Sequence, residues 1–197
     1  MLYFIFMEIK LLEVSGVKTA LLAMRSPHRS YSQSDTTDFD LANKRFGEKD
    51  RKLAMSLITA GDDHSKFMRL IQCYIEIRAA RYFWQQFDTY RCGIEKVSES
   101  TMFDFTKNKI FSADEFEGGL DERILTILNE QQSFIQQKQL LSESYLQKRI
   151  VVASYQALRN IVKARKCHKL EEWQLFVFFC DESNSIQFFI RRGVNGA

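Results

Sequence analysis

Several familiar sequence signals are missing from this chain of 197 residues. It contains no G-x-G-x-x-G and no P-loop, which excludes the Rossmann and Walker phosphate cradles, and it lacks the G-x-S-x-G elbow of serine hydrolases. The net charge is only +3, so no global basic field favours nucleic acid as a partner.

Histidine and cysteine are too scattered for a metal site. The three histidines show no i, i+4 pairing and have no cysteine pair nearby. The four cysteines include no C-x-x-C, and we interpret them as reduced thiols of a cytoplasmic protein: Cys73, Cys92, Cys167 and Cys180.

Long hydrophobic runs are also missing, so we expect no membrane partner. Residues 1–7 are apolar but far too short to span a bilayer, and they lack the basic start and cleavage site of a signal peptide. Two interpretations remain open for them: an N-terminal strand, or residues that precede a true start at Met7.

Aromatic side chains, in contrast, are abundant, with 17 Phe, 7 Tyr and 2 Trp. Such a content favours large buried contacts and a subunit interface. The sequence shows no internal repeat, low-complexity segment or linker, which predicts one domain over residues 1–197.

Hydrophobic patterning predicts interspersed strands and helices. Residues 67–77 alternate apolar and polar positions, which indicates a strand, and a helix is expected over 79–87, although the whole run also scores as helix. Gly61 suits the end of a helix over 44–59. Further strands are expected at 8–14 and within 103–110, and further helices at 17–24 (capped by Ser15), 121–133, 134–146, 148–166 and 171–180, with residues 186–190 completing the core.

The densest run of polar side chains, residues 85–93, directly follows the most apolar stretch of the first half of the chain. An apolar element that ends in such side chains indicates a scaffold presenting a polar site, and Arg91 is suited to clamp a phosphate. Residues 98–102 add serine hydroxyls close by. The alternative is a solvated turn after a core helix, and the spacing alone does not decide between them.

Arg165 falls on the apolar face of its predicted helix, together with Tyr155 and Leu158. An arginine there needs an anionic partner, which favours a phosphate, a carboxylate or an ionisable base edge. The alternative is an arginine that snorkels near the helix C-terminus and interacts with the dipole. His64 and His168 are each open to a structural interpretation as well.

The order of several segments resembles the flavin-dependent thymidylate synthases. The pieces are residues 48–53 (EKDRKL), 57–61 (LITAG), 64–67 (HSKF), 79–91, 98–102, and 157–165 followed by His168. The family motif R-H-R-x-x-S reads TYRCGI here, so only Arg91 of that motif remains, and residues 97–102 lack the family's arginine. The chain therefore resembles a divergent branch of the kind found among phage-encoded relatives.

The resemblance implies a fold and an assembly. The expected fold is α+β, a curved antiparallel sheet flanked by helices, and the expected assembly is a homotetramer with sites shared between subunits. It also implies site residues: deoxyuridylate at Gln86, Arg91 and Arg165, phosphate contacts at Ser98, Ser100 and, with a gap in the alignment, Arg149, and flavin contacts at His64, Arg91, Asn160 and His168.

The activity that the resemblance implies is reductive methylation of deoxyuridylate, with FAD as cofactor and with methylenetetrahydrofolate and NADPH as co-substrates. In it, Arg165 would be the catalytic group that stabilises the anionic pyrimidine. The alternative is a non-catalytic nucleotide-binding or assembly protein on the same fold, with an eroded flavin site. The pyrimidine and the one-carbon donor stay open.

Overall fold

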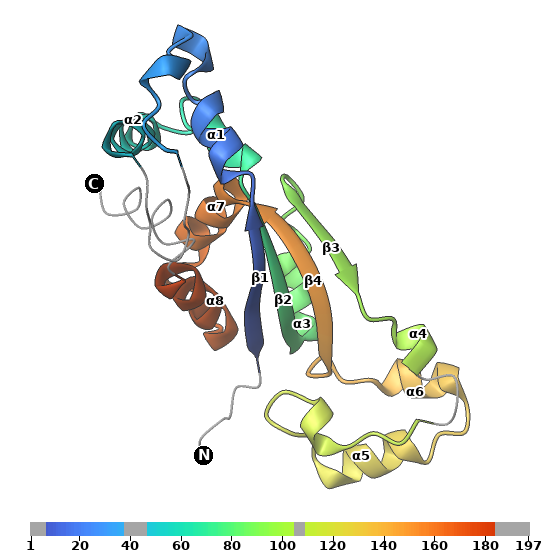
Figure 1. The fold of residues 1–197 in the computed structure, drawn as a ribbon. Helices are drawn as coiled ribbons and strands as arrows, with labels where there is room; N and C mark the ends of the chain where they lie inside the picture. Colours follow the sequence, from blue (N-terminus) through green and yellow to red (C-terminus); the bar gives the residue numbers. More distant parts are fainter. Residues whose placement is uncertain (1–6, 38–46, 105–108, 184–197) are drawn as a thin grey trace. The chain divides into compact units, whose positions relative to one another are not determined.

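The computed structural model describes residues 7–37, 47–104 and 109–183 of the chain. Within them, a four-stranded antiparallel sheet has the strand order β1-β2-β4-β3 (Figure 1). This confirms the predicted α+β class. The strands are β1 (Glu8–Ser15), β2 (Gln72–Ala80), β3 (Ile94–Ser98) and β4 (Leu146–Ser154), and the helices are α1 (Val17–Ala23), α2 (Glu48–Thr59), α3 (Arg81–Phe87), α4 (Thr101–Asp104), α5 (Glu122–Asn129), α6 (Phe134–Leu140), α7 (Tyr155–Arg165) and α8 (Glu171–Glu182).

The chain divides into two compact units, and each of the four strands is divided between them. The prediction of a single domain stays a prediction. The first unit comprises Met1–Lys10, Glu76–Tyr90 and Lys96–Ile150, and the second comprises Leu11–Ile75, Arg91–Glu95 and Val151–Ala197.

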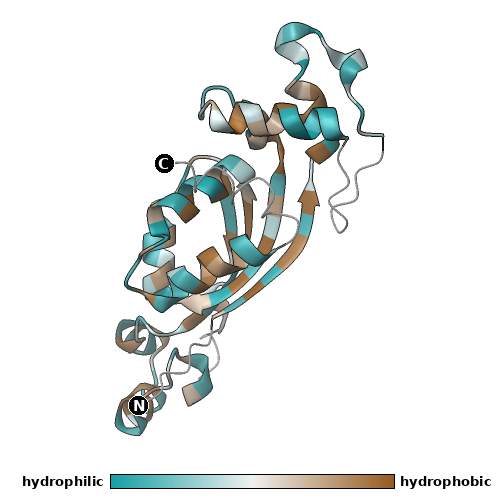
Figure 2. Ribbon diagram, turned by 90° about the vertical axis from the view of Figure 1, so that its left-hand side faces the viewer, coloured by the Kyte–Doolittle hydropathy of each residue, from teal (hydrophilic) through white to brown (hydrophobic). Residues whose placement is uncertain are grey.

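Strand β2 shows the alternation that the sequence indicated. Cys73, Ile75 and Ile77 are fully buried, whereas the residues between them are partly exposed. The strand begins later than residue 67, however, because Lys66–Leu70 form a 3-10 segment. Figure 2 shows the resulting change between hydrophobic and hydrophilic positions along the strands.

The helix predicted over 148–166 is wrong in its first part, because β4 continues to Ser154. Residues 150–152 are Ile-Val-Val, whose branched side chains favour a strand. Helix α7 then begins at Tyr155, and the Ser154 side chain caps it by accepting a hydrogen bond from the Ala157 amide. The branched apolar residues thus belong to the strand, and the serine cap marks the start of the helix within the same hydrophobic segment.

Other boundaries also differ from expectation. Ser15 ends β1, and Gly16 rather than Ser15 is the N-cap of α1. Of the segment 103–110, where a strand was expected, Phe103 and Asp104 are helical and residues 109 and 110 lie in no strand, while residues 105–108 lie outside the described residues. The helix expected over 134–146 is shorter, because α6 ends at Leu140, residues 141–145 form the connection, and β4 begins at Leu146. Gly61, with a φ of 109°, follows α2 as predicted. The predictions for residues 1–6, 38–46 and 186–190 lie outside the described residues.

The first unit is built around aromatic side chains. Phe83, Trp84 and Phe87 of α3 are fully buried, with ring centroids 5.4 to 5.7 Å apart. The Trp84 indole donates to the Gln147 carbonyl at 2.9 Å, which ties α3 to β4. A second cluster forms around Phe111, Phe116, Leu128, Leu141 and Tyr145.

The second unit contains α1, α2, α7 and α8. Helix α7 buries Leu158, Ile161 and Val162, and α8 buries Trp173 and Phe176. The amide of Tyr155 donates to the Ile71 carbonyl at 3.0 Å, so the start of α7 is fixed to the residue before β2.

Candidate functional site

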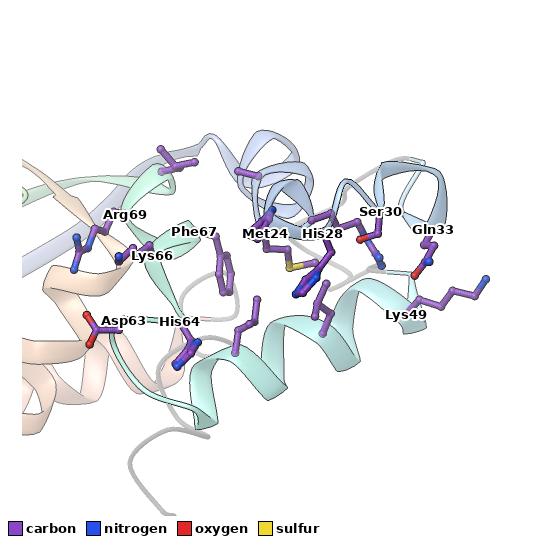
Figure 3. Close-up of a pocket in the computed structure, with 16 residues that line it drawn as sticks. Met24, His28, Ser30, Gln33, Lys49, Asp63, His64, Lys66, Phe67 and Arg69 are labelled. Atoms are coloured by element: carbon purple, nitrogen blue, oxygen red, sulfur yellow. The ribbon is translucent and has the colours of Figure 1, made fainter.

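A pocket of about 990 Å³ opens in the second unit (Figure 3). Residues 23–33, helix α2 and residues 63–70 supply its walls. Met24, Leu53, Leu57 and Phe67 make part of the lining apolar. A pocket of this volume with an apolar wall suits the flat face of an aromatic ligand.

Basic side chains outnumber acidic ones in the same lining. His28 comes from one wall and His64 from another, and both are labelled in Figure 3. Asp63 is the acidic member of the set. Such a lining favours an anion, and a phosphate is the natural partner of these groups. The remaining basic side chains are Arg25, Lys49, Lys66 and Arg69.

One pocket wall is pinned by a buried ion pair. Arg25 donates from Nε to Asp50 Oδ1 at 2.6 Å, and both side chains are almost completely buried. Ser34 Oγ donates to Asp50 Oδ2 at 2.7 Å. Burial alone would raise the pKa of Asp50, but the hydrogen bonds from Thr36, Ser34 and Arg25 outweigh it and lower that pKa. The carboxylate therefore holds residues 25–36 against α2.

The N-terminus of α2 is capped by the same segment. The Asp35 carboxylate accepts from the amides of Lys49 and Asp50 at 2.9 and 3.1 Å. Backbone hydrogen bonding from Lys49 is the main cause that lowers the pKa of Asp35. A cap from a distant residue gives no local sequence signal, which is why sequence reasoning missed Asp35 and Asp50.

His64 is exposed and lines the pocket, and a hydrogen-bond chain links its neighbour to Asn160. Ser65 Oγ donates to Gln156 Oε1 at 3.3 Å, and Gln156 Nε2 donates to Asn160 Oδ1 at 3.2 Å. Asn160 is exposed at the end of this chain. The hydrogen-bond chain ends at Ser65, the residue after His64, and Asn160 is not among the residues that line the pocket.

Arg165 and His168 both lie against Trp173. The Arg165 guanidinium carbon is 4.4 Å from the Trp173 ring centroid, and the His168 ring is 6.1 Å from it. A cation over an aromatic face explains how an arginine is tolerated on the apolar side of α7. Partial burial and the positive charge of Arg165 lower the pKa of His168, whose Nδ1 accepts from the Leu170 amide.

Arg91 is exposed just beyond α3. Two residues later, Gly93 adopts a φ of 71°, and its carbonyl accepts from the Ser154 amide at 2.9 Å. A Cβ at Gly93 would lie 2.8 Å from Ser154 Oγ. The segment that carries Arg91 is therefore held close to the start of α7 by a position that favours glycine.

In the first unit, Arg149 already has protein partners. Its Nη1 donates to both carboxylate oxygens of Asp88, at 2.9 and 3.0 Å, and its guanidinium carbon lies 4.4 Å from the Trp84 ring centroid. Lys96 Nζ also reaches Asp88, at 3.1 Å. A phosphate at Arg149 would have to compete with Asp88.

The other predicted substrate residues of the first unit occupy α3 and the end of β3. Gln86 is half-buried, and its carbonyl accepts from Thr89 Oγ1 at 2.7 Å. Ser98 and Ser100 are exposed, and Ser100 Oγ accepts from the Met102 amide at 3.2 Å. Their roles toward a nucleotide stay predictions, as do those of Arg91, Arg165 and the flavin residues.

Residues 7–37, 47–104 and 109–183 contain no group of three or more His, Cys, Asp or Glu side chains that could hold a metal ion. No helix among them is long and apolar enough to cross a membrane.

No family model and no curated protein matches this sequence. Solved structures do resemble it. Thymidylate Synthase X (ThyX) from Helicobacter pylori, solved with FAD and dUMP, superimposes with a TM-score of 0.74 at 18% identity, over 97% of this chain and 100% of that chain. A second structure of that enzyme with FAD and dUMP gives a TM-score of 0.73 at 19% identity, over 93% and 97%.

A third similar structure is the UMP/dUMP methylase PolB from Streptomyces cacaoi, bound with 5-Br dUMP. Its TM-score is 0.66 at 12% identity, over 95% of this chain and 96% of that chain. At such identities the likeness concerns the fold alone. The chain accordingly has the fold of the ThyX thymidylate synthases, across nearly its whole length.

Proposed function

We propose that this protein binds FAD and deoxyuridylate and catalyses the reductive methylation of deoxyuridylate to thymidylate. The observation that supports this most strongly is the structural likeness to Helicobacter pylori ThyX over 97% of this chain and all of that one. A whole-chain likeness argues that the parts of the fold that surround the ligands in the neighbour have counterparts here. We also propose that this chain is a divergent member of the flavin-dependent thymidylate synthase family, of the phage-encoded kind.

The pocket in the second unit fits a flavin dinucleotide chemically. Its apolar wall of Leu53, Leu57 and Phe67 suits an isoalloxazine or adenine face, and its basic side chains suit a pyrophosphate. We propose that His64, which lines the pocket, and Asn160, which is bonded through Gln156 to the neighbour of His64, hold the flavin. Arg91 and His168 are the further proposed flavin contacts.

Deoxyuridylate is proposed to bind at Gln86, Arg91, Ser98 and Ser100, with Arg149 as a further phosphate contact. The two serines are exposed and offer hydroxyl donors, and Arg91 is exposed and carries a permanent charge. Arg149 takes this role only if phosphate displaces Asp88, since that carboxylate receives two of its hydrogen bonds.

Arg165 is the proposed catalytic residue. Its guanidinium stays charged at every relevant pH, so it would stabilise negative charge on the pyrimidine as the methyl group is added at C5. The contact of its guanidinium carbon with the Trp173 ring, 4.4 Å from the centroid, would restrain the side chain in advance and lower the cost of orienting it. Bound flavin would supply the hydride that the reaction needs.

The remaining parts of the proposal concern co-substrates and assembly. Methylenetetrahydrofolate would supply the one-carbon unit and NADPH the reducing equivalents. We propose a homotetramer in the cytoplasm, with sites shared between subunits. The exposed apolar side chains of α5 and α6 in the first unit, Ile124, Ile127 and Ile135, agree with a surface that another subunit covers.

A second candidate function is nucleotide binding without catalysis. The engagement of Arg149 by Asp88 favours it, as does the sequence TYRCGI, which retains a single arginine of the family triplet. Each missing charge-assisted contact would weaken ligand binding by about 1.5–3 kcal/mol.

Calorimetric titration of the purified full chain with FAD, and separately with deoxyuridine monophosphate, tests the proposal. We expect the purified protein to carry flavin near stoichiometry, and we expect saturable binding of FAD and of the nucleotide once that flavin has been removed. Binding of the nucleotide without FAD would select the non-catalytic function. Absence of binding by both ligands would contradict the proposal.

A further inference from the structure

The turn that follows α2 presents two residues to the pocket. Asp63 and His64 are exposed and line it (Figure 3). The residues on either side of this pair form side-chain hydrogen bonds with α7. Asp62 precedes the pair and Ser65 follows it. The turn is therefore held at both of its ends, with its middle facing the pocket.

Arg159 of α7 holds the first end. Its side chain is almost completely buried, and its Nη1 donates to Asp62 Oδ1 at 3.1 Å. Its Nη2 lies 3.5 Å from the carbonyl of Ile58, in the last turn of α2. Its Nε is buried with no hydrogen-bond partner among the described residues. A buried guanidinium that is incompletely paired adds little to stability, so a positional role explains it better.

Gln156 of the same helix holds the second end. It accepts from Ser65 Oγ at 3.3 Å, and both side chains are buried. Gln156, Arg159 and Asn160 follow one another at i, i+3 and i+4, which places them on one face of α7. One helix face therefore sets the position of the whole turn.

We propose that Arg159 is a positioning residue, which through Asp62 holds the turn of residues 62–65 so that His64 meets a phosphorylated aromatic ligand in the pocket. The inference rests on the proposed function for its ligand, FAD. Because the contacts of Arg159 and Gln156 exist before any ligand binds, the turn does not have to be ordered during binding, and this favours affinity. Arg159 itself does not line the pocket.

Two variants of the full chain, Arg159→Met and Asp62→Ala, test this role from its two sides. The first readout is the ligand-free NMR signal of the His64 imidazole, assigned with His64→Gln. The second is the Kd for FAD. Lys163→Met is the matched control, since it removes an exposed positive charge from the same helix. Arg159→Lys tests rescue by a smaller cation.

We expect the His64 signal to move in both variants and to stay unchanged in the control. The Kd for FAD should rise about tenfold in each variant, and the double variant should bind no more weakly than the singles, because both act through one contact. Arg159→Lys should recover part of the loss. If Arg159→Met fails to fold, the His64 signal and the Kd for FAD of Asp62→Ala test the positioning role instead. Asp62 is half exposed, so we expect its replacement to leave the fold intact.

An unchanged His64 signal in Arg159→Met or in Asp62→Ala would overturn the positioning role. So would additive losses of affinity in the double variant. Wild-type protein that does not bind FAD would contradict the proposed function instead, and the His64 signals would then still decide whether Arg159 positions the turn.

Discussion

Replacing Asp50 with asparagine should destabilise the second unit strongly. Asp50 is fully buried, and it accepts from Arg25, Ser34 and the Thr36 amide. Asp50→Asn leaves the Arg25 guanidinium buried beside a neutral amide that also presents a donor to the same partners. Breaking a buried pair in this way costs about 3–5 kcal/mol. Removing both charges with Arg25→Met and Asp50→Leu should cost less than the single change.

Urea unfolding followed by tryptophan fluorescence measures this cost. Trp173 of the second unit and Trp84 of the first are both fully buried, so the measurement uses a Trp84→Phe background, in which the emission of Trp173 reports the loss of packing in the second unit. Lys52→Met is the control, because Lys52 forms an exposed pair with Glu48 at 3.7 Å. We expect less than about 1 kcal/mol for this control. A loss below about 1 kcal/mol in Asp50→Asn would refute the argument that the pair anchors the pocket wall.

The same pair predicts a dependence on pH. Because folding lowers the pKa of Asp50, its contribution to stability is present above the pKa of the unfolded state, about 3.9, and is lost as the pH falls through the lower pKa of the folded state. The difference in unfolding free energy between wild type and Asp50→Asn should therefore shrink in acid. A difference that stays constant down to pH ~2 would contradict the lowered pKa.

Three further substitutions have defined outcomes. Arg91→Ala should weaken binding of deoxyuridylate or FAD by about 1.5–3 kcal/mol with little change in the thermal midpoint, and unchanged calorimetric affinities would place Arg91 outside the site. Ser154→Ala should lower the free energy of unfolding by about 1 kcal/mol, because it removes the cap of α7, and a neutral result in urea would show that the cap is dispensable. Gly93→Ala should cost about 1–2 kcal/mol through its positive φ, and stabilisation instead would mean that the turn relaxes without strain.

The segments with a clear local signal could be predicted from the sequence. The alternation through Ile75 and Ile77, and the glycine at position 61, correctly indicated a strand and a helix end. The prediction for residues 148–166 was wrong in its first part because the apolar residues there fit the spacing of a strand as well as that of a helix. Only Ser154, as the cap of α7, marks the point where the strand gives way to the helix. Strand β3 was not predicted because Ile94 is its only buried residue, so its sequence shows no alternation of apolar and polar positions. Such a pattern is expected for a strand at the edge of the sheet.

The pocket could be predicted only in part. His64, named from the resemblance, lines the pocket, whereas Asn160, named in the same way, is not among its lining residues and is bonded through Gln156 to Ser65. His28 reaches the same pocket as His64 through the tertiary fold, which the spacing in the sequence does not reveal. The restraining contacts of Asp50 and Arg159 join residues 25 and 97 positions apart, and no local pattern reports such pairs.

The central claim, thymidylate synthesis on this fold, is tested most directly by mass spectrometry of the nucleotide product. The purified full chain would be supplied with deoxyuridine monophosphate, FAD, methylenetetrahydrofolate and NADPH. The account predicts conversion to thymidine monophosphate that requires deoxyuridine monophosphate, methylenetetrahydrofolate and NADPH, depends on FAD when bound flavin has first been removed, and is lost in Arg165→Ala. Unchanged deoxyuridylate with the wild-type protein, despite bound FAD, would contradict it.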